Sequence, residues 1–91
     1  MFEEEKALKE LKGLHPEINI SPSKATAKMK LAENTEVHID PSVPCQDWLV
    51  IDLKSGNFSR AKDANISIEE RLQLLELSED LERVYTPGVA K

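Results

Sequence analysis

The chain has 91 residues, a net charge of −5 at pH 7 and one cysteine. This length limits the chain to one domain with a small core, and its acidic balance opposes wholesale binding to a nucleic-acid backbone. A lone cysteine excludes an intrachain disulfide and the CxxC pairs of zinc ribbons and redox proteins.

The N-terminal residues do not have the pattern of a targeting sequence. Residues 1–6 lack the positively charged leader and the apolar segment of a signal peptide. No apolar run approaches the ~20 residues that a membrane-spanning helix needs. Together with the single cysteine, these features favour a cytoplasmic protein without membrane contact.

Residues 3–12 predict a short helix that begins with three glutamates, which suit the positive end of the helix dipole. Its apolar residues recur at three- and four-residue steps and form one stripe: Ala7, Leu8, Leu11 and Leu14. We expect Gly13 to cap this helix in a left-handed conformation. The dipeptide at Pro16 then favours an extended connector through Pro22.

Residues 25–31 alternate strictly between apolar and polar side chains, which predicts a half-buried strand. The rival interpretation is a helix with Pro22 at its first position, since alanine, lysine and methionine are good helix formers. The unbroken alternation favours the strand. A turn at residues 33–34 and renewed alternation over residues 36–40 predict a hairpin.

Residues 48–53 form the most apolar stretch and are predicted to be the central strand. The segment 54–57 has turn composition, and residues 58–61 are expected to return as a short edge strand. The pattern thus predicts an α+β fold: an N-terminal helix, a small antiparallel sheet of three or four strands, and a C-terminal helix.

A capping box, Ser67 followed three residues later by Glu70, predicts the start of the C-terminal helix. Its apolar residues lie on two nearly opposite sides: Ile68, Leu72 and Leu75 on one, and Leu74, Leu77, Leu81 and Val84 on the other. Either the helix breaks near Ser78, or one continuous helix buries one face in its own core and one in a partner. We favour the break, within a single domain of residues 1–84 followed by a tail, 85–91.

Few residues have the types and spacing that catalysis or metal binding requires. His38 and Asp40 share a strand face with Glu36, yet three groups on a flat strand cannot surround an ion, so we expect a solvated polar face. Pairing of Cys45 with His38 as nucleophile and base is less favoured than a small buried thiol. We therefore predict no metal, no cofactor and no small-molecule substrate.

Lysines mark one face of the first predicted strand, at Lys24, Lys28 and Lys30. They could contact an anion or RNA, but this strand lacks the aromatic residues that stack on bases. Pairing with Glu36 across the hairpin and protection of a sheet edge are the favoured roles. Nucleic-acid binding is therefore not expected.

Residues 80–90 read Asp-Leu-Glu-Arg-Val-Tyr-Thr-Pro-Gly-Val-Ala. This segment, about a tenth of the chain, resembles the N-terminal signature of malic enzymes, in which Asp-Leu leads into Tyr-Thr/Ser-Pro-Gly-Val-Ala. The resemblance implies that Tyr85 is a proton donor in an N-terminal fragment of an oxidative decarboxylase. The family's catalytic lysine, metal-binding carboxylates and nucleotide-binding domain would then lie beyond Lys91.

Our leading functional prediction is a small, non-catalytic protein-binding or interaction module, with self-association as one form of that interaction. The expected interface is one side of the C-terminal helix with a secondary aromatic anchor: Leu74, Leu77, Leu81, Val84 and Trp48. The malic-enzyme fragment is one alternative. The other is a viral or mobile-element protein that blocks a host target through acidic residues: Glu69, Glu70, Glu76, Glu79, Asp80 and Glu82.

Overall fold

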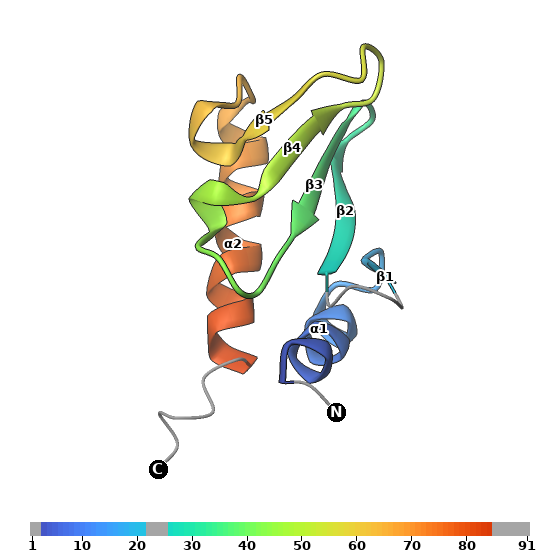
Figure 1. Ribbon diagram of the computed structural model, residues 1–91, viewed down its shortest axis with the longest axis vertical. Coiled ribbons are helices and arrows are strands. Elements are labelled where there is room, and N and C mark those ends of the chain that lie inside the picture. Colours follow the sequence, from blue (N-terminus) through green and yellow to red (C-terminus); the bar gives the residue numbers. More distant parts are fainter. Residues whose placement is uncertain (1–2, 22–25, 85–91) are drawn as a thin grey trace.

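The computed structural model describes residues 3–21 and 26–84 of the chain (Figure 1). Helix α1 covers Glu3–Leu14 and helix α2 covers Ile68–Val84. Between them lie the strands β1 (Asn19–Ser21), β2 (Thr26–Ala32), β3 (Thr35–Ile39), β4 (Leu49–Asp52) and β5 (Phe58–Arg60). Single 3₁₀ turns precede β4, at Cys45–Asp47, and follow β5, at Ala61–Asp63.

The five strands form one antiparallel sheet in the order β1-β2-β3-β4-β5, so each strand pairs with its neighbour in the sequence. This confirms the predicted α+β fold, with five strands instead of three or four. The additional strand is β1, within the segment predicted to be a connector, where Ile20 pairs with Ala27. Three residues are too few for alternation to reveal a strand.

The predicted hairpin is present as β2 and β3, with Met29 opposite Val37 in the register. Ala27, Met29 and Leu31 are buried, as the alternation requires. The prediction that residues 48–53 form the central strand is wrong, because β1 extends the sheet on the other side and makes β3 central. The apolar run is instead divided between the sheet's two faces: Val50 is buried, whereas Leu49 is 38% exposed.

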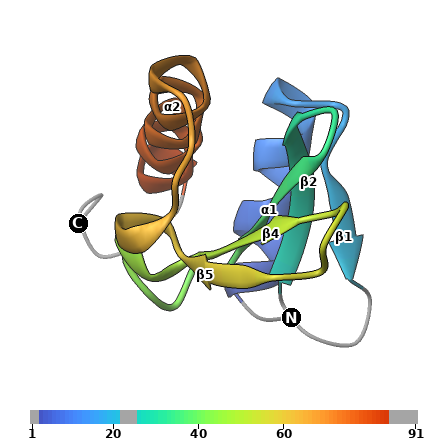
Figure 2. The same ribbon diagram turned by 90° about the horizontal axis from the view of Figure 1, so that it is seen from above.

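Both helices lie on the same side of the sheet, which bends around them (Figure 2). One hydrophobic core fills the space between the sheet and the helices. It contains Ala7, Leu8, Leu11, Ile18, Ala27, Met29, Leu31, Val37, Ile39, Trp48, Val50, Ala61, Leu74, Leu77 and Leu81. The fold is therefore a two-layer structure in which the other side of the sheet is left without a helical cover by the described residues.

Helix α1 buries Ala7, Leu8 and Leu11 as predicted, but Leu14 is 55% exposed. Gly13 lies within the helix and has no left-handed backbone, which corrects the expected cap. Lys12 Nζ donates hydrogen bonds to the carbonyl oxygens of Pro16 and Ile18, which lie in the segment after the helix. Lys12 therefore joins the end of α1 to the segment that leads into β1.

The predicted capping box opens α2. The backbone N–H of Ser67 donates to Glu70 Oε1 over 2.7 Å, and the backbone N–H of Glu70 donates to Ser67 Oγ over 3.1 Å. The helix then continues through Ser78 to Val84, so the favoured break is wrong. Leu74, Leu77 and Leu81 follow one unbroken three- and four-residue spacing into the core, which only a continuous helix can provide.

The two helices contact each other, and the residue that follows α1 is bonded to α2. His15 Nε2 lies 2.8 Å from Asp80 Oδ2, and both side chains are largely buried. Asp80 Oδ1 also accepts a hydrogen bond from Arg83 over 3.2 Å. Within residues 3–21 and 26–84, neither helix is long and apolar enough to cross a membrane.

Candidate interaction surfaces

The structure places most of the predicted interface residues in the hydrophobic core. Leu74, Leu77 and Leu81 are 2%, 0% and 5% exposed, and Trp48 is 2% exposed. The Trp48 Nε1–H donates to the carbonyl oxygen of Asp40 over 2.9 Å, which fixes the indole inside the domain. Val84 is half-buried against the same core. This corrects the predicted interface, since side chains that fill the core cannot offer a binding surface.

The opposite side of α2 carries exposed apolar side chains. Ile68, Leu72 and Leu75, which we call the α2 stripe, are 79%, 60% and 44% exposed. Their four- and three-residue spacing aligns them along one side of the helix. Exposed glutamates continue and flank this stripe: Glu69, Glu76, Glu79 and Glu82. The sequence had revealed both apolar sides, but it could not decide which one the core would take.

A second surface lies on the side of the sheet that faces away from the helices. We call it the open sheet face, and it consists of Lys28, Lys30, Glu36, His38, Leu49, Ile51, Phe58 and Arg60. The strand register aligns these residues in two rows across the sheet, Lys28–His38–Leu49–Arg60 and Lys30–Glu36–Ile51–Phe58. Phe58 is 67% exposed, an unusual position for a large aromatic side chain.

Sequence reasoning missed the open sheet face because it depends on register across four strands. Alternation within residues 48–53 could have shown that Leu49 and Ile51 point opposite to Trp48 and Val50. What it could not show is that Phe58 pairs with Ile51, since the intervening turn allows more than one register. Only the pairing brings the apolar and basic residues onto one continuous surface.

The polar residues singled out as candidate ligands do not converge. His38 Nε2 lies 3.4 Å from Glu36 Oε1 on the open sheet face. The Asp40 carboxylate instead accepts hydrogen bonds from the backbone N–H and the hydroxyl of Ser42, over 2.9 and 2.7 Å. Among the described residues, no three His, Cys, Asp or Glu side chains come close enough together to hold a metal ion.

Cys45 and the lysines have ordinary surroundings. The Cys45 thiol is half-buried against the core in the 3₁₀ turn before β4. Lys28 and Lys30 lie on the open sheet face, with Lys30 directly opposite Glu36 in the register. Lys24 lies outside the described residues. The lysine face of the hairpin is therefore part of a larger surface that also has apolar side chains.

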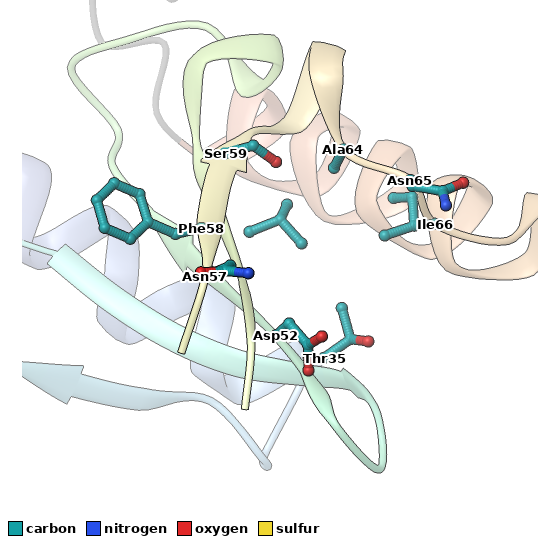
Figure 3. A pocket seen from close by; sticks show the side chains of 9 residues that line it. Thr35, Asp52, Asn57, Phe58, Ser59, Ala64, Asn65 and Ile66 are labelled. Carbon is teal, nitrogen blue, oxygen red and sulfur yellow. The ribbon is translucent and has the colours of Figure 1, made fainter. Parts of the chain in front are cut away.

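Hollows in the surface are shallow and mixed in character. One, of about 360 Å³, lies between the β4–β5 hairpin and the segment that leads into α2 (Figure 3). Asp52, Asn57, Ser59 and Asn65 line it together with Phe58, whose ring points away from the other lining side chains. A second hollow, of about 450 Å³, includes His38, Leu49 and Arg60 and so extends the open sheet face.

Comparison of the chain with protein-family models, with curated proteins and with solved structures finds no match. Tyr85, the residue that the malic-enzyme resemblance assigns a role, lies outside the described residues. Two other residues of that motif have structural contacts here: Asp80 binds His15 and Arg83, and Leu81 belongs to the core. The resemblance remains a prediction from the sequence.

Proposed function

We propose that this chain is a non-catalytic protein-binding module and that the α2 stripe is its primary contact surface. The proposal rests on one observation: Ile68, Leu72 and Leu75 are exposed on a helix whose opposite side is already committed to the core. A cytoplasmic setting belongs to the proposal, and the free, half-buried Cys45 thiol is compatible with a reducing compartment.

The geometry of α2 favours recognition of its exposed side by another protein. Side chains spaced i, i+4 and i+7 are the usual anchors when a helix docks into an apolar groove. Here the helix is held in place by Leu74, Leu77 and Leu81, so binding would not have to order it. Each large apolar side chain fully covered by a partner would contribute about 1.5–3 kcal/mol before the costs of association.

The titratable residues discussed so far have contacts that suit a structural role. The lowered pKa of Glu70 arises first from its hydrogen bond with the Ser67 backbone, and thus from the helix cap. His15 and His38 each lie beside a carboxylate, on Asp80 and Glu36. Such pairs fit the maintenance of a scaffold, because neither lines a closed pocket with a nucleophile.

Site-specific photo-crosslinking tests the proposal. A photoreactive amino acid at position 72 is expected to crosslink to a defined protein in cells that express the full chain. The matched control carries the same group at Leu14, which is also exposed and helical but lies on α1. Ile68→Glu in the position-72 variant should abolish the adduct. Equal adducts from positions 72 and 14, or none from position 72, would contradict the proposal.

The glutamates beside the stripe support a second candidate, an inhibitor that binds a basic target through its acidic side. Glu69, Glu76, Glu79 and Glu82 surround the apolar residues and are all exposed. Salt separates the two candidates, because exposed charge pairs weaken strongly with ionic strength and apolar contacts do not. When the crosslinking is repeated in lysate, a yield that falls steeply between about 0.05 and 0.5 M salt would favour the inhibitor.

A further inference from the structure

The open sheet face combines an apolar half with a basic half. Leu49, Ile51 and Phe58 lie on β4 and β5, whereas Lys28 and Lys30 lie on β2. Lys28 and Lys30 at the β2 side and Arg60 on β5 outnumber the one acidic side chain, Glu36 on β3, so this surface is locally positive on a chain of net charge −5. A partner that covers it should be apolar at one end and acidic at the other.

The exposed side of α2 has this composition in the matching order. Its apolar residues lie in the first two turns, from Ile68 to Leu75, and Glu79 and Glu82 follow toward the C-terminal end. From Leu72 to Glu79 the helix rises ~10 Å. From β4 to β2 the sheet spans two strand spacings, also ~10 Å. A helix lying across the strands would therefore set its leucines on β4 and its glutamates on β2.

One chain cannot bring these two surfaces together by itself. The leucines on the inner side of α2 are buried in the core between the helix and the sheet, so the α2 stripe points away from the sheet. The open sheet face points in the other direction, as the view from above shows (Figure 2). Each surface remains accessible to a second molecule.

We infer that the open sheet face binds the exposed side of α2 from a second copy of this chain, in a head-to-tail arrangement. This inference rests on the proposed function and names the partner. The interface is heterologous: Phe58, Leu49 and Ile51 of one copy cover the α2 stripe of the next, and Lys28 and Lys30 pair with Glu79 and Glu82. Such contacts produce open chains or rings, unlike a two-fold dimer.

Sedimentation velocity of the full chain over a wide concentration range tests the head-to-tail arrangement. The wild type should form a series of oligomers that grows with concentration. Phe58→Glu blocks the sheet side and Leu72→Glu blocks the helix side, and each should shift association to concentrations about thirtyfold higher, as expected for an interface anchor. Leu14→Glu, an exposed leucine on neither surface, is the matched control and should behave as the wild type.

Mixing the two blocked variants distinguishes the head-to-tail arrangement from every symmetric one. Phe58→Glu keeps a free helix side, and Leu72→Glu keeps a free sheet side. An equimolar mixture should therefore form a one-to-one dimer and nothing larger. A mixture that remains monomeric would overturn the inference, as would a Phe58→Glu variant that self-associates like the wild type, since that result indicates contact between two helices.

Charge exchange tests the orientation of the helix on the sheet. In the Leu72→Glu background, which leaves only the sheet side free, Lys28→Glu with Lys30→Glu should abolish binding to the helix side of the Phe58→Glu variant. Glu79→Lys with Glu82→Lys in the Phe58→Glu variant should restore this binding. If the exchanged charges fail to restore binding while circular dichroism shows both variants folded, the proposed orientation is wrong.

The outcome is separable from that of the proposed function. A wild type that stays monomeric at every concentration overturns the second copy as the partner, yet leaves the crosslink from position 72 to another protein as an independent result. Adducts from position 72 that contain only a second copy of the chain, together with intact head-to-tail oligomers, would instead overturn recognition of a different protein. Circular dichroism of each variant ensures that neither result reflects unfolding.

Discussion

The two sides of α2 carry similar amounts of apolar side chain but have opposite fates. Leu74, Leu77 and Leu81 are at most 5% exposed, whereas the α2 stripe is at least 44% exposed. Residue type therefore does not decide which side enters the core. The difference teaches that the rotation of a helix about its axis is set by the contacts at its beginning as much as by its apolar pattern.

Those contacts are visible in the first turns of α2. The Arg71 guanidinium donates hydrogen bonds to the carbonyl oxygens of Ala61 and Ala64, over 3.2 and 2.9 Å. Together with the Ser67 cap, these bonds fix the helix relative to the segment that enters it. With Arg71 bound on that side, the following Leu74 points into the core and Leu72 points to solvent.

The difference between the buried and the exposed side of α2 is tested most directly by shortening one leucine on each side. Leu77→Ala should lower the free energy of unfolding by about 3 kcal/mol, because it removes a fully buried side chain and leaves a cavity. Leu75→Ala should change it by about 0.5 kcal/mol, as expected for a largely exposed position. Urea unfolding at low protein concentration measures both. Equal losses would show that the two sides are not distinguished as the structure indicates.

Trp48 offers a second contrast, between an inward residue directly before β4 and an outward residue at the start of that strand. Trp48→Phe should lower the free energy of unfolding by about 1–2 kcal/mol, since the Asp40 carbonyl loses its N–H donor and the core loses volume. Leu49→Ala, on the open sheet face, should cost about 0.5 kcal/mol in the monomer. A larger loss at Leu49 than at Trp48 would contradict the assignment of the two faces.

The sequence was sufficient for features that depend on local patterns. Alternation predicted the β2–β3 hairpin, and the spacing of Ser67 and Glu70 predicted the start of α2, because each signal lies within a few residues. Features that depend on distant contacts were missed. The central position of β3, the burial of Leu77 and the exposure of Phe58 all depend on which segments pack together.

The helix cap at Ser67 also bears on the two sides of α2, because it stabilises the start of the helix that carries both. Ser67→Ala should lower the free energy of unfolding by about 1 kcal/mol, through loss of the hydroxyl that accepts the Glu70 N–H. Ser67→Thr is the conservative control, since threonine retains the acceptor. Chemical denaturation followed by circular dichroism reports the change. A loss from Ser67→Thr as large as that from Ser67→Ala would exclude the cap as its cause.

The smallest expected effect is a pH dependence at Glu70. Its hydrogen bond with the Ser67 backbone lowers the pKa of this carboxyl from the usual 4.5 in the folded state. The stabilisation is therefore complete above that value and is lost as pH falls through the lower, folded-state pKa. The difference in unfolding free energy between the wild type and Glu70→Gln should shrink over this acidic range. A difference independent of pH there would contradict the prediction.

The order of the strands has a consequence for how the chain folds. Because each strand pairs with the one before it, every hairpin can close over a short loop, and the sheet needs no long-range crossover. The union of α1 with α2, where His15 meets Asp80, instead joins residues 65 positions apart. A contact over so long a separation raises the contact order, so we expect helix docking to follow the formation of the hairpins. The contact between His15 and Asp80 thus joins the two helices and completes the domain.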